Sequence, residues 1–201
     1  MDRRTFLGAS AVALTVTLLD QPNVLASGQV LKLPEPDTKG GLPLMQCLAK
    51  RHTNRDLGAE DLTLPEVSNI LWAAYGVNRK DGRHVIPTAR NQQKVMVFAV
   101  LGDGVWKYLP EKNSIEKVLD DDRRKDFDGS AMILLYAAPA NDQFGGMHVG
   151  AMYQNVGLYC ASKGYANCVK YMRCDILDNV LPFPDGWKVL ISQSVGPVKK
   201  K

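Results

Sequence analysis

The chain has 201 residues, of which 45% are hydrophobic and 23% charged, and its formal net charge is +4. This length and composition indicate one globular domain with a core of its own and room for a tail. The basic residues are scattered, which argues against a nucleic-acid-binding protein, because such proteins concentrate positive charge on one face or helix.

The first 26 residues differ from the rest of the chain. Arg3 and Arg4 precede an apolar run, TFLGASAVALTVTLL, that is short and rich in small residues for a membrane span. Pro22 ends the run, and VLA up to Ala26 has the pattern of a cleavage site. Because DRRTFLG resembles a twin-arginine export signal, we predict a signal peptide over residues 1–26 and a periplasmic or otherwise exported protein. A retained N-terminal anchor is the alternative.

Residues 27–41 are rich in proline and glycine and predict an extended leader, followed by a domain over residues 42–201. The stretch LPLMQCLAK, residues 42–50, has helical spacing and leads directly into a cluster of cationic residues, RHTNRD, at 51–56. Taken alone, this cluster is most typical of a solvated helix end.

A second helix is predicted after Thr63, because Glu66 follows it three residues later as in a capping box. Gly76 is a natural C-terminal stop for this helix. Its apolar face consists of Val67, Ile70, Leu71 and Ala74. A long polar loop over residues 78–93 follows.

Strands are predicted over residues 94–101 and 104–110, joined by a hairpin turn at Gly102 and Asp103. The charged run at 120–128 predicts a solvated helix or loop. The near-continuous apolar run at 131–139 is typical of a buried central strand.

A long helix is predicted over residues 145–164, stopped by Gly164, then a short helix around 175–181 and a last strand over 187–196. The inward face of the long helix is expected to carry Val149, Met152, Tyr153, Val156, Tyr159 and Cys160. Helices and strands follow one another without regular β-α-β alternation, which indicates the α+β class.

The four cysteines form no C-x-x-C pair and the three histidines are far apart in the sequence, which argues against a zinc site. The apolar surroundings of Cys160 and Cys168 favour buried thiols. One disulfide is the alternative in an oxidising compartment.

No G-x-G-x-x-G, P-loop, H-E-x-x-H or G-x-S-x-G motif is present. What the chain offers is a set of hydrogen-bond donors without an evident nucleophile. This set comprises Arg51, His52, Thr53, Arg55, Arg90, Asn91 and the lysines at the C-terminal end. Such an inventory suits a site for an anionic cofactor that carries the reaction itself.

Four stretches in order resemble the FMN-dependent nitroreductase family, in particular its small branch related to the oxidases that make thiazole and oxazole rings. They are RHTNRDL, ILWAAYGVNRKDGRHVIPTARNQQ, QNVGLYCASKGYANC and SVGPVKK, and they span most of residues 44–199. The resemblance implies an α+β fold with a mainly antiparallel central sheet flanked by helices, and FMN at the interface of a homodimer. The broad apolar face expected on the long helix at 145–164 also predicts a dimer.

The resemblance also assigns roles to residues. The family's R-[RH]-[ST]-x-[RK] motif matches Arg51, His52, Thr53 and Arg55, which implies that Arg51 and Thr53 hold the ribityl-phosphate and that Arg55 reaches the pyrimidine edge of the flavin ring. With this context, the functional interpretation of the cluster is favoured over that of a solvated helix end.

A second family motif, P-S-x-x-N, matches Pro87, Thr88 and Asn91, and implies a hydrogen bond from Asn91 to the flavin. The backbone near Tyr171 and Met172 is expected beside flavin N5, where family members often have Gly-Gly or Glu-Gly. Lys199 is the expected basic residue that completes the phosphate site.

The resemblance therefore predicts an exported FMN-dependent oxidoreductase that passes two electrons to a nitro, quinone or related small-molecule acceptor. The electron donor is either NAD(P)H, as in most relatives, or a donor of the periplasm, where NAD(P)H is scarce. The alternative is a non-catalytic flavin- or ligand-binding protein that has kept the fold.

Overall fold

A computed structural model describes residues 28–200, so the signal peptide predicted over residues 1–26 lies outside the described part. The strands are β1 Val30–Lys32, β2 Met96–Leu101, β3 Gly104–Leu109, β4 Ser114–Leu119, β5 Met132–Pro139, β6 Ala166–Lys170 and β7 Trp187–Gly196. The α-helices are α1 Leu44–Lys50, α2 Leu64–Tyr75 and α3 Gly145–Lys163, with short 3₁₀ helices at Ala89–Asn91, Pro110–Lys112 and Arg124–Asp126.

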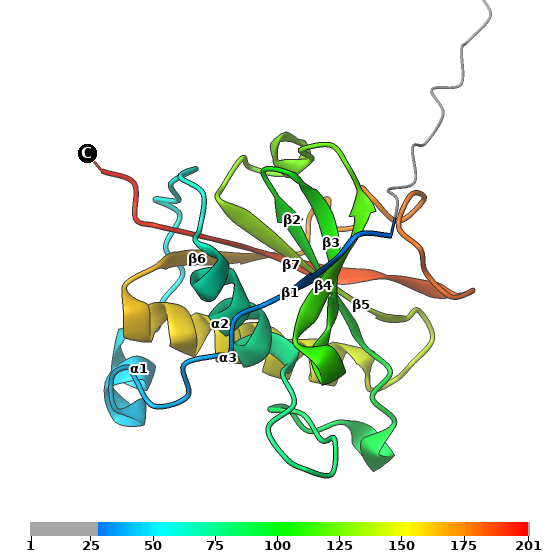
Figure 1. The fold of residues 1–201 in the computed structure, drawn as a ribbon, viewed down its shortest axis with the longest axis horizontal. Coiled ribbons are helices and arrows are strands. Elements are labelled where there is room, and N and C mark those ends of the chain that lie inside the picture. Colours follow the sequence, from blue (N-terminus) through cyan, green and yellow to red (C-terminus); the bar gives the residue numbers. More distant parts are fainter. Residues whose placement is uncertain (1–27, 201) are drawn as a thin grey trace, which may run out of the picture.

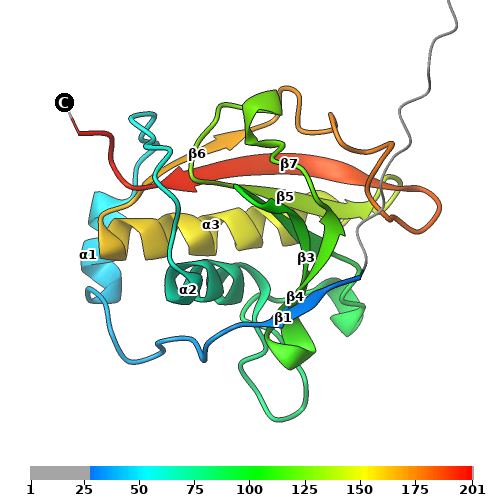
Figure 2. The same ribbon diagram turned by 45° about the horizontal axis from the view of Figure 1, so that its top comes forward.

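The strands form one seven-stranded sheet in the order β1-β4-β3-β2-β5-β7-β6, and each neighbouring pair is antiparallel. The three helices cover one face of this sheet (Figures 1 and 2). The connection between β6 and β7 crosses the other face. This is the α+β architecture that the element order predicts.

Each face of the sheet has its own hydrophobic core, and β5 contributes to both. Leu134 and Tyr136 pack on the helix side, whereas Ile133 and Leu135 pack against the β6–β7 connection. Because both faces are covered, β5 is apolar at every position from 132 to 138 and buried throughout. The prediction of a buried central strand is confirmed.

The three longest predicted elements are confirmed with small changes at their ends. At the start of α2, the carboxylate of Glu66 accepts hydrogen bonds from the backbone N–H of Thr63 (2.6 Å) and from its hydroxyl (2.7 Å). At the end of α3, Gly164 adopts a left-handed φ of 79°, which favours glycine. Four of the six side chains expected on the inward face of α3 are buried, and Tyr153 and Tyr159 are half-buried.

The prediction of a short helix around residues 175–181 is wrong. The segment forms successive tight turns, with Asp178 N–H bonded to Asp175 O and Val180 N–H bonded to Leu177 O. Its fold is set by packing, since Leu177 and Leu181 insert into the core on this face of the sheet. The carboxylate of Asp178 also accepts a hydrogen bond from Val189 N–H of β7 at 3.0 Å.

Three strands were not predicted from the sequence: β1, β4 and β6. The stretch of the predicted leader that forms β1 pairs with β4 at the sheet edge. The charged run at 120–128 is a loop with one 3₁₀ turn, within the two alternatives predicted for it.

All four cysteines are free and buried. The prediction of buried thiols for Cys160 and Cys168 is therefore confirmed. Burial raises the pKa of the Cys160 thiol to about 12.

Within residues 28–200, no helix combines the length and hydrophobicity that crossing a membrane requires.

Candidate functional site

The cationic segment at 51–58 joins α1 to α2 and is fixed by backbone hydrogen bonds to two distant parts of the chain. Asn54 N–H donates to Asn167 O of β6 at 2.9 Å. Gly58 N–H donates to Pro197 O, and Lys199 N–H donates to Asp56 O, both at 2.8 Å. The segment and the C-terminal stretch therefore lie side by side at one end of the molecule (Figures 1 and 2).

This contact needs glycine at position 196. A Cβ atom added there would lie 2.7 Å from the carbonyl oxygen of Gly58, which is closer than real Cβ contacts. The VGP stretch after β7 thus brings the end of the chain against the cationic segment. It places the backbone of Lys199 beside that of Asp56, within the RHTNRD cluster.

The predicted side chains of this segment are exposed: Arg51, His52, Thr53 and Arg55. Among residues 28–200, the guanidinium groups of Arg51 and Arg55 form no ion pair or hydrogen bond. The ring of His52 is oriented by a 2.8 Å contact between Nδ1 and the carbonyl oxygen of Lys50. The segment therefore offers free cationic donors on a fixed backbone, which suits an anion such as phosphate.

Arg51 directly follows the last residue of α1, and its side chain lies along α3. A Cβ added at Gly157 of α3 would lie 3.6 Å from both Cγ and Cδ of Arg51, an ordinary van der Waals distance, so the arginine stem lies against α3 at this position. The same Cβ position at Gly157 would lie 3.7 Å from Oδ1 of Asn167.

A buried polar network lies beneath the segment and was missed by the sequence analysis. Tyr136 donates its hydroxyl hydrogen to Gln193 Oε1 at 2.6 Å, and Gln193 Nε2 donates to Asn167 Oδ1 at 3.3 Å. Asn167 is also the residue whose carbonyl holds Asn54. The sequence signal that could have found it is the polar triplet SQS, residues 192–194, inside an otherwise apolar strand.

The second predicted group, Pro87, Thr88 and Asn91, lies in the loop between α2 and β2. Here Arg90, Asn91 and Gln93 each have a φ of +53°, a left-handed conformation that is costly for residues other than glycine. Gln93 N–H donates to Thr88 Oγ1 at 3.3 Å, which closes the loop on itself. Such strain persists only where surrounding contacts enforce it.

His148, in the first turn of α3, anchors this loop. Its Nε2 accepts a hydrogen bond from Ala89 N–H at 2.8 Å. The side chain is buried, and Nδ1 has no partner among the described residues. No motif in the sequence points to a role for His148.

Tyr171 and Met172 follow β6 and are among the most exposed large hydrophobic residues, at 75% and 79%. Just before them, Lys170 forms an ion pair with Asp128. Burial raises the pKa of Asp128, but the hydrogen bonds from Lys170 and Ser130 outweigh it and leave that pKa below its usual value. The end of β6 is thereby tied to the loop before β5.

One chain brings together only part of the predicted set. Arg51, Thr53, Arg55 and Lys199 share one end of the molecule, where Arg51 contacts α3 at Gly157. The loop at 87–91 is instead bonded to His148. This residue precedes Gly157 by nine positions on α3, which corresponds to about 13 Å along the helix.

The architecture matches that of solved structures over nearly the whole chain. A Ralstonia eutropha protein named as a nitroreductase aligns with 92% of this chain and 96% of its own, at 28% identity and a TM-score of 0.78. The chain has a nitroreductase-like fold. A nitroreductase from Bacteroides fragilis, solved with bound FMN, shares this fold at 14% identity and a TM-score of 0.54, over 78% of this chain and 88% of its own.

Sequence comparison gives a partial match to a protein with the same kind of name. A Methanocaldococcus jannaschii protein named as a nitroreductase is 34% identical over 101 residues, which are 47% of this chain. The alignment spans half the length of that relative. No family model matches the chain.

The fold is also shared with a subunit of the Escherichia coli microcin synthetase complex, at 17% identity and a TM-score of 0.63, over 98% of this chain and 85% of the other. The nitroreductase-like fold predicted from the four motifs is confirmed. The particular branch within it stays a prediction.

Proposed function

We propose that the protein is an exported FMN-dependent oxidoreductase that passes two electrons through bound flavin to a nitro, quinone or related small-molecule acceptor. The proposal rests on the cationic segment at 51–58. Its two arginines form no ion pair among residues 28–200, and backbone hydrogen bonds hold it beside Lys199. It occurs on a fold whose solved examples include FMN-bound nitroreductases.

The residues present fit a phosphate-bearing flavin. Arg51 and Lys199 supply cationic donors and Thr53 supplies a hydroxyl, and all three are exposed on adjoining segments. The stem of Arg51 lies against α3 at Gly157. Arg55, two residues beyond Thr53, then belongs to the end of the site that holds the ring system.

The second half of the site comes from a partner subunit. In one chain the loop of Pro87, Thr88 and Asn91 is anchored about 13 Å along α3 from Arg51, and a homodimer supplies a second copy of this loop. Exposed apolar side chains on α1 offer a contact surface for that partner: Leu44 at 63%, Met45 at 73% and Leu48 at 45% exposure.

When bound, FMN supplies two-electron chemistry that no side chain of the protein offers. In this proposal Arg51, Thr53 and Lys199 bind and orient the cofactor through its phosphate. Arg55 stabilises negative charge at the pyrimidine edge, and Asn91 of the second subunit donates a hydrogen bond to the ring. The donor is NAD(P)H or a reductant of the periplasm.

The cofactor is tested by purifying the protein and identifying the released ligand by mass. We expect yellow protein with non-covalent FMN, and weaker FMN binding in Arg51→Ala and Thr53→Ala than in the control Lys125→Ala, which changes an exposed lysine elsewhere. Colourless protein that does not take up FMN on reconstitution contradicts the proposal.

A non-catalytic binding protein is the second candidate, and one observation favours it. Tyr171 and Met172 present two large exposed side chains where family members often have small residues, and these side chains would hinder donors and acceptors from reaching a bound flavin. Steady-state assays with artificial donors and a nitroaromatic or quinone acceptor separate the two. Sustained turnover supports the enzyme, and its absence with FMN-loaded protein supports the binding protein.

Export is tested separately, by changing Arg3 and Arg4 together to lysine. We expect the precursor to remain in the cytoplasm, because the translocation machinery reads the arginine pair. Unchanged export of the variant argues for the general secretory route instead.

A further inference from the structure

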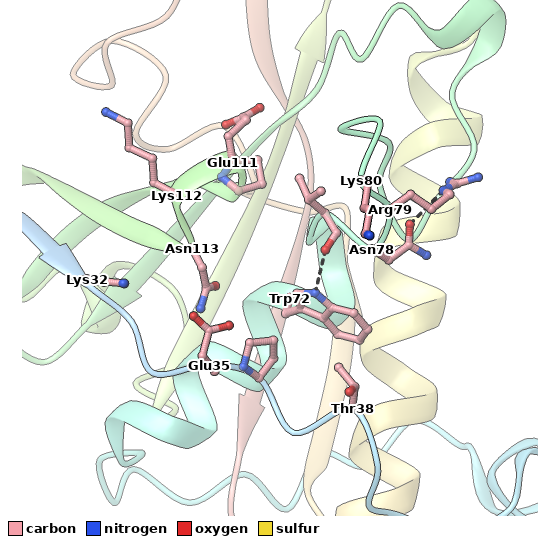
Figure 3. Close-up of a pocket in the computed structure, with 13 residues that line it drawn as sticks. Lys32, Glu35, Thr38, Trp72, Asn78, Arg79, Lys80, Glu111, Lys112 and Asn113 are labelled. Carbon is pink, nitrogen blue, oxygen red and sulfur yellow. Dashed lines mark hydrogen bonds between the residues drawn. The ribbon is translucent and has the colours of Figure 1, made fainter.

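A separate cavity of about 770 Å³ lies at the C-terminal end of α2 (Figure 3). Four parts of the chain form it: residues 32–38 from the last residue of β1 onward, Trp72 of α2, residues 77–80 and the turn at 110–113. None of the residues predicted for the flavin site lines it. Its volume is within the usual range for small-molecule sites.

One wall of the cavity is the indole of Trp72, which is held in a single orientation. Its Nε1 donates a hydrogen bond to Val77 O at 3.2 Å, as drawn in Figure 3. A Cβ at Gly76 would lie 2.1 Å from Cδ1 of Trp72, so the indole occupies space that only glycine leaves open. The ring is half-buried and presents a flat apolar surface to the cavity.

The opposite wall is also fixed. Asn113 has a left-handed φ of 42°, and its Nδ2 donates to Pro34 O at 2.8 Å and to Ser68 Oγ at 3.3 Å. Its Oδ1 accepts a hydrogen bond from the hydroxyl of Tyr108 at 3.1 Å. These bonds join the turn at 110–113 to the stretch after β1, so both walls exist before any ligand arrives.

The rim carries an excess of positive charge. Four cations line the cavity, Lys32, Arg79, Lys80 and Lys112, against two carboxylates, Glu35 and Glu111. Within the described part of the chain, none of these six forms an ion pair. Arg79 is positioned by hydrogen bonds from Nε to Asn78 Oδ1 (3.0 Å) and from Nη2 to His84 O (2.7 Å).

A preformed cavity with a fixed indole and unpaired cations suits a ligand that is both flat and negatively charged. An inorganic ion alone would leave the indole surface uncovered, and a neutral aromatic molecule would leave the cations unused. We propose that this cavity binds a small aromatic carboxylate, with its ring against Trp72 and its carboxylate towards Lys80, which lies on the same side of the cavity in Figure 3. The cavity adjoins the pocket that contains Pro87, Thr88 and Asn91, with Arg79 between the two, but none of those three residues lines it.

The test is calorimetric titration of the full mature protein, saturated with FMN, with 2-naphthoate as the probe. We expect saturable binding that weakens as salt is added, and much weaker binding of 2-naphthamide, which has the same ring system without the charge. Equal binding of the two probes, or no binding of naphthoate at millimolar concentration, overturns the proposal. If the protein does not take up FMN, the titration is run on the protein as purified, so its result is independent of the flavin proposal.

Substitutions of residues that line the cavity show whether naphthoate binds there. Lys80→Ala is expected to weaken naphthoate binding about two- to fivefold, given the small value of one exposed charge pair, whereas Lys125→Ala leaves it unchanged. Trp72→Leu removes the quenching of protein fluorescence by naphthoate. Unaltered affinity in Lys80→Ala, or displacement of naphthoate by FMN in protein not yet saturated with it, assigns the probe to another site and overturns the proposal.

Discussion

At the scale of single residues, the two arginines of the RHTNRD segment differ in what surrounds them. The stem of Arg51 lies against Gly157 of α3, next to the buried Asn167. Arg55 lies beyond the point where Asn54 is bonded to β6, and it faces solvent. If both hold one FMN, they act on different parts of it, since only Arg51 lies along α3 and the bond from Asn54 to β6 separates the two.

This difference predicts separate effects on the cofactor. Arg55→Ala should lower the midpoint potential of the bound flavin by roughly 30–65 mV, because a charge-assisted contact contributes about 1.5–3 kcal/mol. Arg51→Ala should instead weaken FMN binding and leave the potential of the bound fraction close to that of the wild type. Dye-linked redox titration and an FMN dissociation constant for each variant measure the two effects. A potential that does not move in Arg55→Ala would make this residue a structural helix-end arginine.

The cysteines give a second prediction at this scale. All four are buried and unpaired, and burial raises the pKa of Cys160 to about 12. A buried, protonated thiol reacts slowly. We therefore expect a thiol reagent to modify the native protein slowly and to titrate four thiols per chain after denaturation without reductant. Fewer than four in denaturant would reveal a disulfide and contradict the described geometry.

At the scale of elements, segments with a local signal were predictable, including the short hairpin strands β2 and β3, whereas β1, β4 and β6 were not. The helices α2 and α3 carry their own signals, such as the Thr63–Glu66 capping box and Gly164. The strand β4 includes the half-buried pair Glu116 and Lys117 and becomes a strand because β3 and β1 pair with it. Pairing partners distant in the sequence leave no local pattern, which is also why Asn167 and His148 were missed.

The loop at 87–93 shows what such a distant contact contributes. Its three left-handed residues are held in part by the bond from Ala89 N–H to His148 Nε2. We predict that His148→Ala destabilises the protein by about 1–3 kcal/mol, since it leaves an N–H without its acceptor. Denaturant unfolding at a fixed excess of FMN measures this loss.

His148→Gln is the matched variant, because its amide oxygen replaces Nε2 as an acceptor at similar reach. It should recover much of the stability that His148→Ala loses. Equal stability of His148→Ala and the wild type would mean that the loop holds its strained conformation without this bond.

At the scale of the whole molecule, α3 separates the two groups of proposed site residues. The helix was expected to offer an apolar face to a partner, but Val149, Met152, Val156 and Cys160 are fully buried by its own chain. The exposed apolar side chains are on α1 instead, together with Val198 at 45% exposure. A dimer that uses α1 and the C-terminal stretch would place its contact beside Arg51 and Lys199, where the proposed cofactor lies.

The last prediction tests whether two chains share each site. Arg51→Ala and Asn91→Ala should each impair FMN binding when the variant is alone, since every site then lacks one contact. In a mixed dimer of the two variants, one site collects both substitutions and the other collects none. After unfolding and refolding an equal mixture, half of the dimers are expected to be mixed, so about a quarter of the sites should bind FMN with wild-type affinity.

Equilibrium titration of the refolded mixture with FMN, with each variant refolded alone as the control, measures this fraction. In one chain Arg51 packs on Gly157 whereas the loop of Asn91 is bonded to His148, nine positions away on α3, so the two residues lie on different parts of this helix and the proposal takes Asn91 from the partner. A mixture with no wild-type sites would place Arg51 and Asn91 of a single chain on the same cofactor. A stable monomer that binds FMN, seen by light scattering at low concentration, would contradict the shared site directly.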